Sequence, residues 1–312
     1  MADLLSYIIR KMILAIPVVV AATVIVFLML YLTPGDPIKS IVPPRAGPDV
    51  YEQVRDKYGL DRPIWEQYGL FVWRAVHGDL GNSITVWQGT SVSKLIAMKL
   101  PNTLMLMGLG LAISYSIAVP LGVISALRQN SWIDRGGMVF TLIAYAMPPF
   151  WLGVVFLMIF AVWLNLLPVE GTTGGLGSLI LPAMTLGVGN AALTTRMMRS
   201  SMLEVIKQDY ITQLKSRGLP GREVIFKHAL KNALLPVITV LGLDIGWFVG
   251  GSVVVEEVFS WPGIGELMTS AIYNHDFPLV QGSILVLAIA VILGNLMADI
   301  LYAWADPRVR LG

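Results

Sequence analysis

The chain contains no cysteine, and few of its residues carry charge. Of its 312 residues only 13% are Asp, Glu, Lys or Arg, and the formal net charge is +2. Without cysteine there is no disulfide, no thiolate nucleophile and no cysteine-ligated metal. The small net charge gives no indication of nucleic-acid binding. These absences exclude a disulfide-stabilised domain and a basic nucleic-acid-binding domain, and they leave the compartment to be inferred from topology.

Motifs for nucleotide, dinucleotide and zinc chemistry are absent as well. The sequence contains no G-x-x-x-x-G-K-[ST], no G-x-G-x-x-G and no H-E-x-x-H. The histidines His77, His228 and His275 fall in different predicted loops, two outside and one inside, so they cannot meet in one metal site. Asp244 and Asp299 are poorly matched in depth for an intramembrane aspartate pair. We therefore expect no catalytic site, metal site or bound cofactor in this chain.

Apolar residues are abundant instead and gather in long runs. They make up 55% of the chain, and the mean hydropathy is +0.71. A helix needs about 20 apolar residues to cross the hydrocarbon core. The first run is longer than the apolar part of a secretion signal, so we expect it to remain as a membrane helix. The prediction is an all-α polytopic membrane protein with about six transmembrane helices, at residues 12–32, 102–127, 138–167 (interrupted by Pro148-Pro149), 179–195, 234–259 and 281–305.

Basic residues segregate to one side of this arrangement. Fourteen of the 22 Lys and Arg residues fall in the two termini, the 128–137 loop and the 196–233 loop, whereas the short loops 168–178 and 260–280 contain none. The other eight lie in 33–101, a predicted extracytoplasmic loop long enough to translocate regardless of charge. The positive-inside rule then predicts that both termini are cytoplasmic.

The predicted cytoplasmic loop 196–233 has the pattern of a helix, a tight turn and a second helix. Four of its side chains recur at helical spacing: Leu203, Ile206, Tyr210 and Leu214. Gly218 can adopt the left-handed conformation that ends a helix, and Pro220 blocks its continuation. A second helix is expected from about Arg222 into the next span. A solvated basic connector is the competing interpretation, but the length and the tight turn favour a docking element.

Eight segments, taken in order, resemble one family. They are TPGDP (33–37), YGLDRPIWEQY (58–68), GDLGNS (78–83), PPFWLG (148–153), RSSMLEVIKQDY (199–210), DYITQLKSRGLPGREVIFKHALKNALLP (209–236), VFSWPGIGEL (258–267) and DPRVR (306–310). Together they resemble, over nearly the whole chain, the permeases of binding-protein-dependent ABC importers, and more narrowly the dipeptide, oligopeptide and nickel branch.

The resemblance implies a single transmembrane permease domain, 1–312, that forms half of a translocation pathway in the cytoplasmic (inner) membrane of a bacterium or archaeon. Its implied partners are a second homologous permease, two ATP-binding subunits and an extracytoplasmic substrate-binding protein. ATP and Mg would be used by those partners, and no cofactor would bind this chain. The implied cargo is a dipeptide or oligopeptide, with a nickel chelate or an oligosaccharide as alternatives. The residues implied to couple to the ATPase are Asp209, Tyr210, Leu214, Lys215, Arg217, Gly218, Leu219 and Pro220.

Asp244 and a set of glycines stand out in the fifth predicted span. A carboxylate near mid-bilayer is costly, so Asp244 is expected either to line the pathway or to form a hydrogen bond between helices. Gly242, Gly246 and Gly250 recur every four residues, a spacing that lets helices pack closely, and a second permease subunit is one candidate neighbour. The loop 260–280 is expected to form an external cap or part of the surface that meets the substrate-binding protein.

Two other functional classes remain open at this stage. A secondary transporter or channel would work alone, but an ion-driven carrier usually needs more intramembrane ionisable groups than Asp244 and Asp299 provide. A membrane enzyme is disfavoured by the missing catalytic residues. A dependence of transport on ATP and on ATPase subunits separates these classes from an importer.

Overall fold

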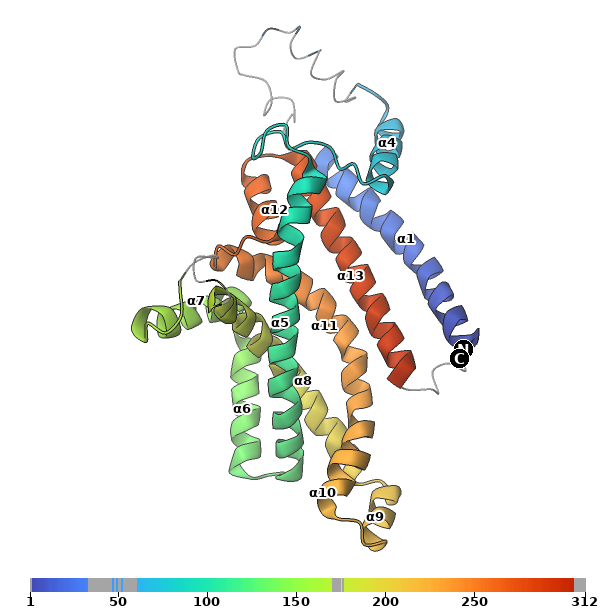
Figure 1. The fold of residues 1–312 in the computed structure, drawn as a ribbon, viewed down its shortest axis with the longest axis vertical. Helices are drawn as coiled ribbons and strands as arrows, with labels where there is room; N and C mark the ends of the chain where they lie inside the picture. The colour runs from blue at the N-terminus through green and yellow to red at the C-terminus, as the bar shows by residue number, and fades with distance from the viewer. Residues whose placement is uncertain are drawn as a thin grey trace. The chain divides into compact units, whose positions relative to one another are not determined.

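The structure is a computed structural model that describes residues 2–32, 47, 49, 52, 61–169, 175 and 177–305. Within those residues the chain is helical, without strands apart from an isolated bridge between Asn82 and Ser91, so the predicted all-α fold is confirmed. The elements are α1 (Ala2–Leu32), α4 (Ile64–Val76), α5 (Val92–Leu127), α6 (Trp132–Ala146), α7 (Pro149–Phe156), the π-helix η1 (Leu157–Trp163), α8 (Gly177–Ile206), α9 (Asp209–Ser216), α10 (Gly221–Glu223), the π-helix η2 (Val224–Ala229), α11 (Leu230–Val258), α12 (Ile264–Tyr273) and α13 (Phe277–Ala305) (Figure 1).

The long helices agree with the predicted membrane spans. In the described part of the chain, five helices are long and apolar enough to cross a bilayer: those at 9–28, 92–127, 177–206, 221–258 and 277–301. The pair formed by α6 and the 149–163 helix makes a sixth if it counts as one span, although it is bent by 109°. Prolines at positions 148 and 149 account for the bend. Met147 takes an extended conformation before them, as residues preceding proline do.

The predicted start of the second span is wrong. The second span begins at Val92, ten residues before the expected start, so the end of the predicted loop 33–101 is helical. The helix continues through Pro101, where a proline removes one backbone hydrogen bond. Val92 and Ile96 are buried on this early part of α5 and stabilise it. Most of residues 33–60, and the DPRVR segment at 306–310, lie outside the described residues.

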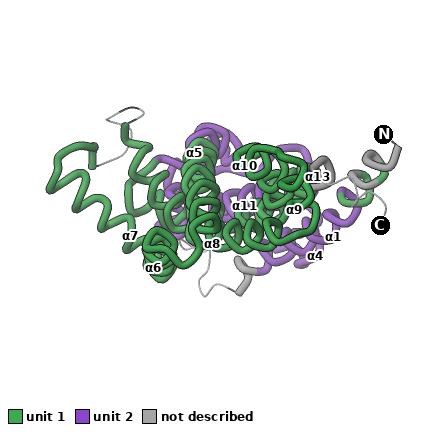
Figure 2. The backbone as a smooth tube through the Cα atoms, turned by 90° about the horizontal axis from the view of Figure 1, so that it is seen from below, with its two compact units in different colours: residues 1–11, 104–261, 293–312 green, residues 12–103, 262–292 purple. Residues whose placement is uncertain are grey.

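Contacts between Cα atoms divide the chain into two compact units, each built from discontinuous segments (Figure 2). Unit 1 comprises 1–11, 104–261 and 293–312, and unit 2 comprises 12–103 and 262–292.

In unit 1, α8 packs against α6, α7 and α11. A Cβ added at Gly187 would lie 2.7 Å from the carbonyl oxygen of Gly110 and 2.8 Å from Cγ2 of Ile113, so glycine allows α5 and α8 to approach closely. A core of buried side chains joins α5, α8, α9, η2 and α11: Val123, Ala126, Met198, Met202, Val205, Ile211, Val224, Ala229, Ala233 and Val237. This core lies beneath the predicted cytoplasmic loop and positions it.

In unit 2, a buried carboxylate organises the predicted outer loops. Asp276 is fully buried, and its Oδ2 accepts the backbone N–H of Ile84 at 3.0 Å, of Thr85 at 3.0 Å and of Val86 at 3.1 Å. Within the predicted outer loop 260–280, the amphipathic helix α12 follows a turn at residues 259–260. The backbone N–H of Ile264, at the start of α12, donates to the Thr103 hydroxyl at 2.8 Å.

Candidate functional site

The segment between α8 and α11 forms a tight elbow, which we define as residues 209–223. α9 ends at Ser216, Gly218 has φ +81°, and α10 begins directly after Pro220. A side chain at Gly218 would be strained because L-residues rarely adopt this conformation. The helix that begins after the turn runs through η2 into α11, as predicted. The elbow is therefore built by the glycine and proline that the sequence pattern singled out.

The prediction of a single amphipathic helix over residues 203–214 is wrong. α8 ends at Ile206, and α9 begins at Asp209 after Gln208, which takes an extended conformation. The apolar spacing suggested one helix because the two helices point their apolar sides at the same core. That core includes Ile211, which is only 1% exposed and anchors α9 with burial worth about 1.5–3 kcal/mol.

The predicted coupling residues divide into two groups. Tyr210, Leu214 and Leu219 are half-buried and pack against the chain's own core, and the Tyr210 hydroxyl accepts a hydrogen bond from Asn232 Nδ2 at 2.7 Å. The side chains or backbone of the others face outward: Asp209, Lys215, Arg217, Gly218 and Pro220. The apolar members therefore hold the elbow in place, and the exposed members are the ones available to a partner.

A shallow hollow beside the elbow was missed from the sequence. It measures about 590 Å³ and is lined by Pro220, Arg222, Glu223, Phe226 and Lys227. Phe226 is 54% exposed although its side chain is large and apolar, and Lys227 forms an ion pair with Glu223 at 2.9 Å. The sequence signal for this hollow is Phe226, an aromatic residue close to the charged residues Glu223 and Lys227. The helical spacing of apolar residues did not assign Phe226 to the core.

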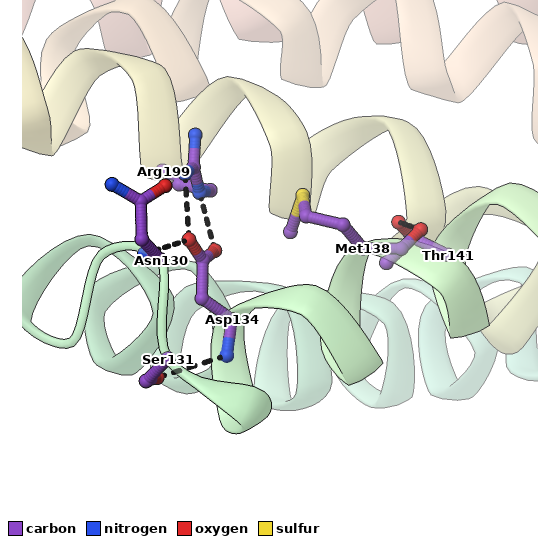
Figure 3. Close-up of polar contacts among 6 residues, drawn as sticks. All are labelled: Asn130, Ser131, Asp134, Met138, Thr141 and Arg199. Atoms are coloured by element: carbon purple, nitrogen blue, oxygen red, sulfur yellow. Dashed lines mark hydrogen bonds and ion pairs between the residues drawn. The ribbon is translucent and has the colours of Figure 1, made fainter.

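An ion pair joins the start of α6 to α8, and Figure 3 shows its geometry. Arg199 Nε lies 2.6 Å from Asp134 Oδ1, and Arg199 Nη2 lies 2.8 Å from Asp134 Oδ2. Asp134 also accepts the backbone N–H of Asn130 at 2.9 Å, and its own N–H donates to Ser131 Oγ, the N-cap of α6. The capping pattern Ser-x-x-Asp was readable in the sequence, but the partner on α8 was not.

The structure places Asp244 in a polar cluster among three helices. It is 3% exposed, and its carboxylate accepts hydrogen bonds from the Tyr115 hydroxyl of α5 at 2.7 Å and from Asn190 Nδ2 of α8 at 2.8 Å. The Ser114 hydroxyl in turn donates to Asn190 Oδ1 at 2.8 Å. Neither Ser114 nor Asn190 was singled out from the sequence. A lone serine or asparagine in an apolar run does not indicate which distant residue it will form a hydrogen bond with.

Asp244 and Asn190 also line a cavity of about 900 Å³. Most of its wall is apolar, from the Pro148-Pro149 break, α8 and α11, and it includes Leu193, Leu243 and Trp247. Arg196 also lines this cavity, with its guanidinium 5.1 Å from the centre of the Tyr145 ring. Both interpretations of Asp244 therefore have a counterpart in the structure: it bridges helices, and it borders a space of ligand size.

The three glycines of α11 differ in their surroundings. A Cβ added at Gly242 would lie 2.9 Å from Cβ of Ala298 on α13, so close packing requires glycine there. A Cβ at Gly250 would meet no atom within 4 Å, and Gly246 is half-buried. Gly242 is thus a packing glycine between helices of this chain, and the role of the glycines at an interface with a second permease stays a prediction.

Comparison with known families identifies the chain. Residues 118–311 match the family described as "Binding-protein-dependent transport system inner membrane component", and residues 4–107 match the N-terminal model of the same transport systems. The chain belongs to this family of inner membrane components. The match to residues 118–311 covers the elbow, the Asp134–Arg199 ion pair and both Asn190 and Asp244, whereas Ser114 and Tyr115 fall between the two matched ranges.

Relatives of this inner membrane component match it from end to end. It is 41% identical to the "Oligopeptide transport system permease protein AppB" of Bacillus subtilis, over 98% of this chain and 99% of the relative. It is 37% identical to the "Dipeptide transport system permease protein DppB" of Alkalihalophilus pseudofirmus, over 98% of this chain and all of the relative. Among solved structures, an inward-facing MetNI methionine ABC transporter has a TM-score of 0.59 at 20% identity, covering 68% of this chain and 97% of the matched chain, which supports the fold alone.

Proposed function

We propose that the chain is the permease subunit of an ATP-driven importer of dipeptides or oligopeptides. The observation that carries the proposal is the end-to-end match, at 41% identity, to a protein named as an oligopeptide permease. The chain would form half of the translocation pathway, with a second homologous permease forming the other half. It would span the inner membrane of a bacterium or archaeon with both termini in the cytoplasm, as the distribution of basic residues indicates.

The elbow is proposed as the contact with an ATPase subunit. Its apolar side is fixed to the chain's own core, and its exposed side presents Lys215, Arg217 and Gly218. Exposed charges steer a partner but contribute little energy, so the neighbouring Phe226, in its hollow, is proposed to supply apolar contact. ATP and Mg would be bound by the ATPase partners, and this chain would contribute no ATPase site.

The cavity bordered by Asp244 is proposed as part of the pathway. Its apolar wall with a few polar groups suits a passing substrate, and its volume of about 900 Å³ is in the range of small-ligand sites. Specificity would rest mainly in the extracytoplasmic substrate-binding protein, which presents the cargo.

Reconstitution in proteoliposomes tests the proposed function. The chain is assembled with its second permease, two ATPase subunits and binding protein, and uptake of a labelled oligopeptide is measured with and without internal ATP. ATP-dependent peptide uptake is expected. ATP-driven uptake of a nickel chelate or an oligosaccharide in place of peptide would correct the cargo, whereas uptake by the chain without ATPases would indicate a stand-alone carrier.

The ATPase contact has a separate test. Phe226→Ala is expected to weaken co-purification of the ATPase subunits, while the variant chain still inserts and folds because the side chain is largely exposed. Lys231→Ala is the matched control, since Lys231 is exposed on the same helical run but does not line the hollow. If both variants co-purify the ATPase subunits as well as the wild-type chain does, Phe226 is not part of the contact.

A further inference from the structure

α4 carries two apolar faces: one packs against described residues of α1, and the other is largely exposed. The first face lies against α1, in the same unit: the Tyr68 ring is 5.5 Å and the Phe71 ring 6.0 Å from the ring of Phe27. The Tyr68 hydroxyl also lies 2.9 Å from the Thr23 hydroxyl. These contacts fix the rotation of α4 about its own axis, so the direction of its other residues is determined.

The second face is an exposed apolar stripe, defined here as Trp65, Gly69, Trp73 and Val76. The exposed fractions are 71% for Trp65, 66% for Trp73 and 78% for Val76. At about 100° per residue, these positions fall within an arc of about 80° around the helix. Arg74 lies about 180° from Trp65 by the same count. The helix therefore has a largely exposed apolar side, on which the His77 ring lies 4.3 Å from the Trp73 ring, and Arg74 points to a different side.

The contacts with α1 also fix the depth of α4. The apolar membrane window of α1 runs from Ile9 to Leu28, and α4 contacts it at Thr23 and Phe27. Thr23 lies about 7.5 Å inside the end of that window, at a rise of 1.5 Å per residue. α4 is thus held beside the last turns of a membrane helix (Figure 1). Tryptophan is enriched at this depth in membrane proteins, because its ring is apolar and its N–H can reach water.

We infer that α4 is an interfacial helix that inserts the Trp65–Val76 stripe into the headgroup boundary of the lipid bilayer. Lipid is the occupant because α1, the membrane helix against which α4 packs, exposes its own apolar side chains along its membrane window: Leu14 is 57%, Ile16 59% and Ile25 59% exposed. Helices of this kind bind by burying one apolar side at the boundary while the charged side stays in water. α4 would anchor the N-terminal part of the permease at one membrane surface, whatever cargo is carried.

Spin-label accessibility in the assembled, reconstituted transporter tests this inference. The chain has no cysteine, so single cysteines can be placed at Trp65, Trp73 and Val76 on the stripe and at Arg74 on the charged side. Collisions with oxygen, which concentrates in lipid, and with a water-soluble nickel complex are then compared. Ile16→Cys is the lipid reference and Asp61→Cys the water reference, with partner subunits freed of accessible cysteine.

The expected oxygen-to-nickel ratio on the stripe is several-fold higher than at Arg74 and lies between those of Asp61 and Ile16, because the headgroup boundary is shallower than the position of Ile16 in the membrane window. Gly69→Cys repeats the measurement with both tryptophans in place, because an added Cβ there meets no atom within 4 Å. A ratio like that of Asp61 would show a water-exposed helix. Low collision with both reagents would show a protein partner on the stripe. Either result would overturn the inference.

Discussion

Arg199 donates two hydrogen bonds to Asp134, one from Nε to Oδ1 and one from Nη2 to Oδ2, so both carboxylate oxygens accept from the same guanidinium. The side chain of Asp134 is 4% exposed and that of Arg199 is 23% exposed, so the pair lies largely out of water. A planar guanidinium matches a carboxylate in this two-point geometry better than a lysine does. The pair ties α8 to the start of α6, which follows α5 after a connection of four residues, 128–131.

Removing one partner of this pair should therefore destabilise the chain. Arg199→Met leaves Asp134 buried without its cation and is expected to cost about 3 kcal/mol, measured as a lower Tm of the purified chain in detergent. Lys227→Met removes a lysine from an exposed ion pair and is the matched control, with no change in Tm expected. Equal Tm values for the two variants would show that the Arg199 pair does not hold α6.

Membrane topology can be read from labelling of single cysteines. Tyr273→Cys, in the predicted outer loop, is expected to react with an impermeant maleimide from outside intact cells, because Tyr273 is 76% exposed. Gly221→Cys, at the elbow, is expected to react only after the membrane is opened. The natural chain contributes no background, since it has no cysteine. Labelling of both positions from the same side would contradict six spans with cytoplasmic termini.

Two variants of Asp244 separate the role of its hydrogen bonds from the role of its negative charge. Asp244→Asn keeps an acceptor for Asn190 and a partner for Tyr115, so assembly and most of the transport rate are expected to survive. Asp244→Leu leaves both donors buried without an acceptor, and a loss of about 1–3 kcal/mol in stability is expected. Transport assays and Tm measurements on the two variants check this. If the Asp244→Asn permease assembles but does not transport, then transport requires the negative charge of Asp244 and not only its hydrogen bonds.

The conformation of Gly218 makes the elbow sensitive to substitution at one position and not at its neighbour. Gly218 has φ +81°, whereas Gly221 opens a helix, and an added Cβ meets no atom within 4 Å at either position. Gly218→Trp is expected to weaken ATPase assembly or abolish transport, while the binding protein still docks. Gly221→Ala should behave as wild type. Normal assembly and transport by the Gly218 variant would make the elbow a passive connector.

The features found from the sequence are those with a local cause. Apolar runs predicted the spans because crossing a bilayer requires a continuous apolar length, and Gly218 with Pro220 predicted the elbow because backbone chemistry dictates it. The start of α5 at Val92 was missed because residues 92–101 contain Lys94 and Lys99 and so do not form a continuous apolar run. The break before Asp209 was missed because two helices facing one core keep a common apolar spacing.

Partnerships between distant residues could not be predicted in the same way. Asp134 and Arg199 are 65 positions apart, and Tyr115 and Asp244 are 129 apart. Each pair depends on how two helices are rotated about their axes, which packing of the whole unit decides. The sequence indicated that Asp244 must have neighbours, because an isolated carboxylate in lipid is costly, but it did not indicate which ones.

The helical run that begins at the elbow gives the permease a lever arm. Residues 221–258 form one helical stretch of 38 residues, although it contains a π-helical turn and Pro236. At 1.5 Å per residue this stretch is about 57 Å long, so a tilt of about 5° about one end displaces the other end by about 5 Å. A tilt of a few degrees about the end at Gly221 would therefore move Val258, at the other end, by about the length of a side chain. The helix would not need to bend at a hinge between these two residues.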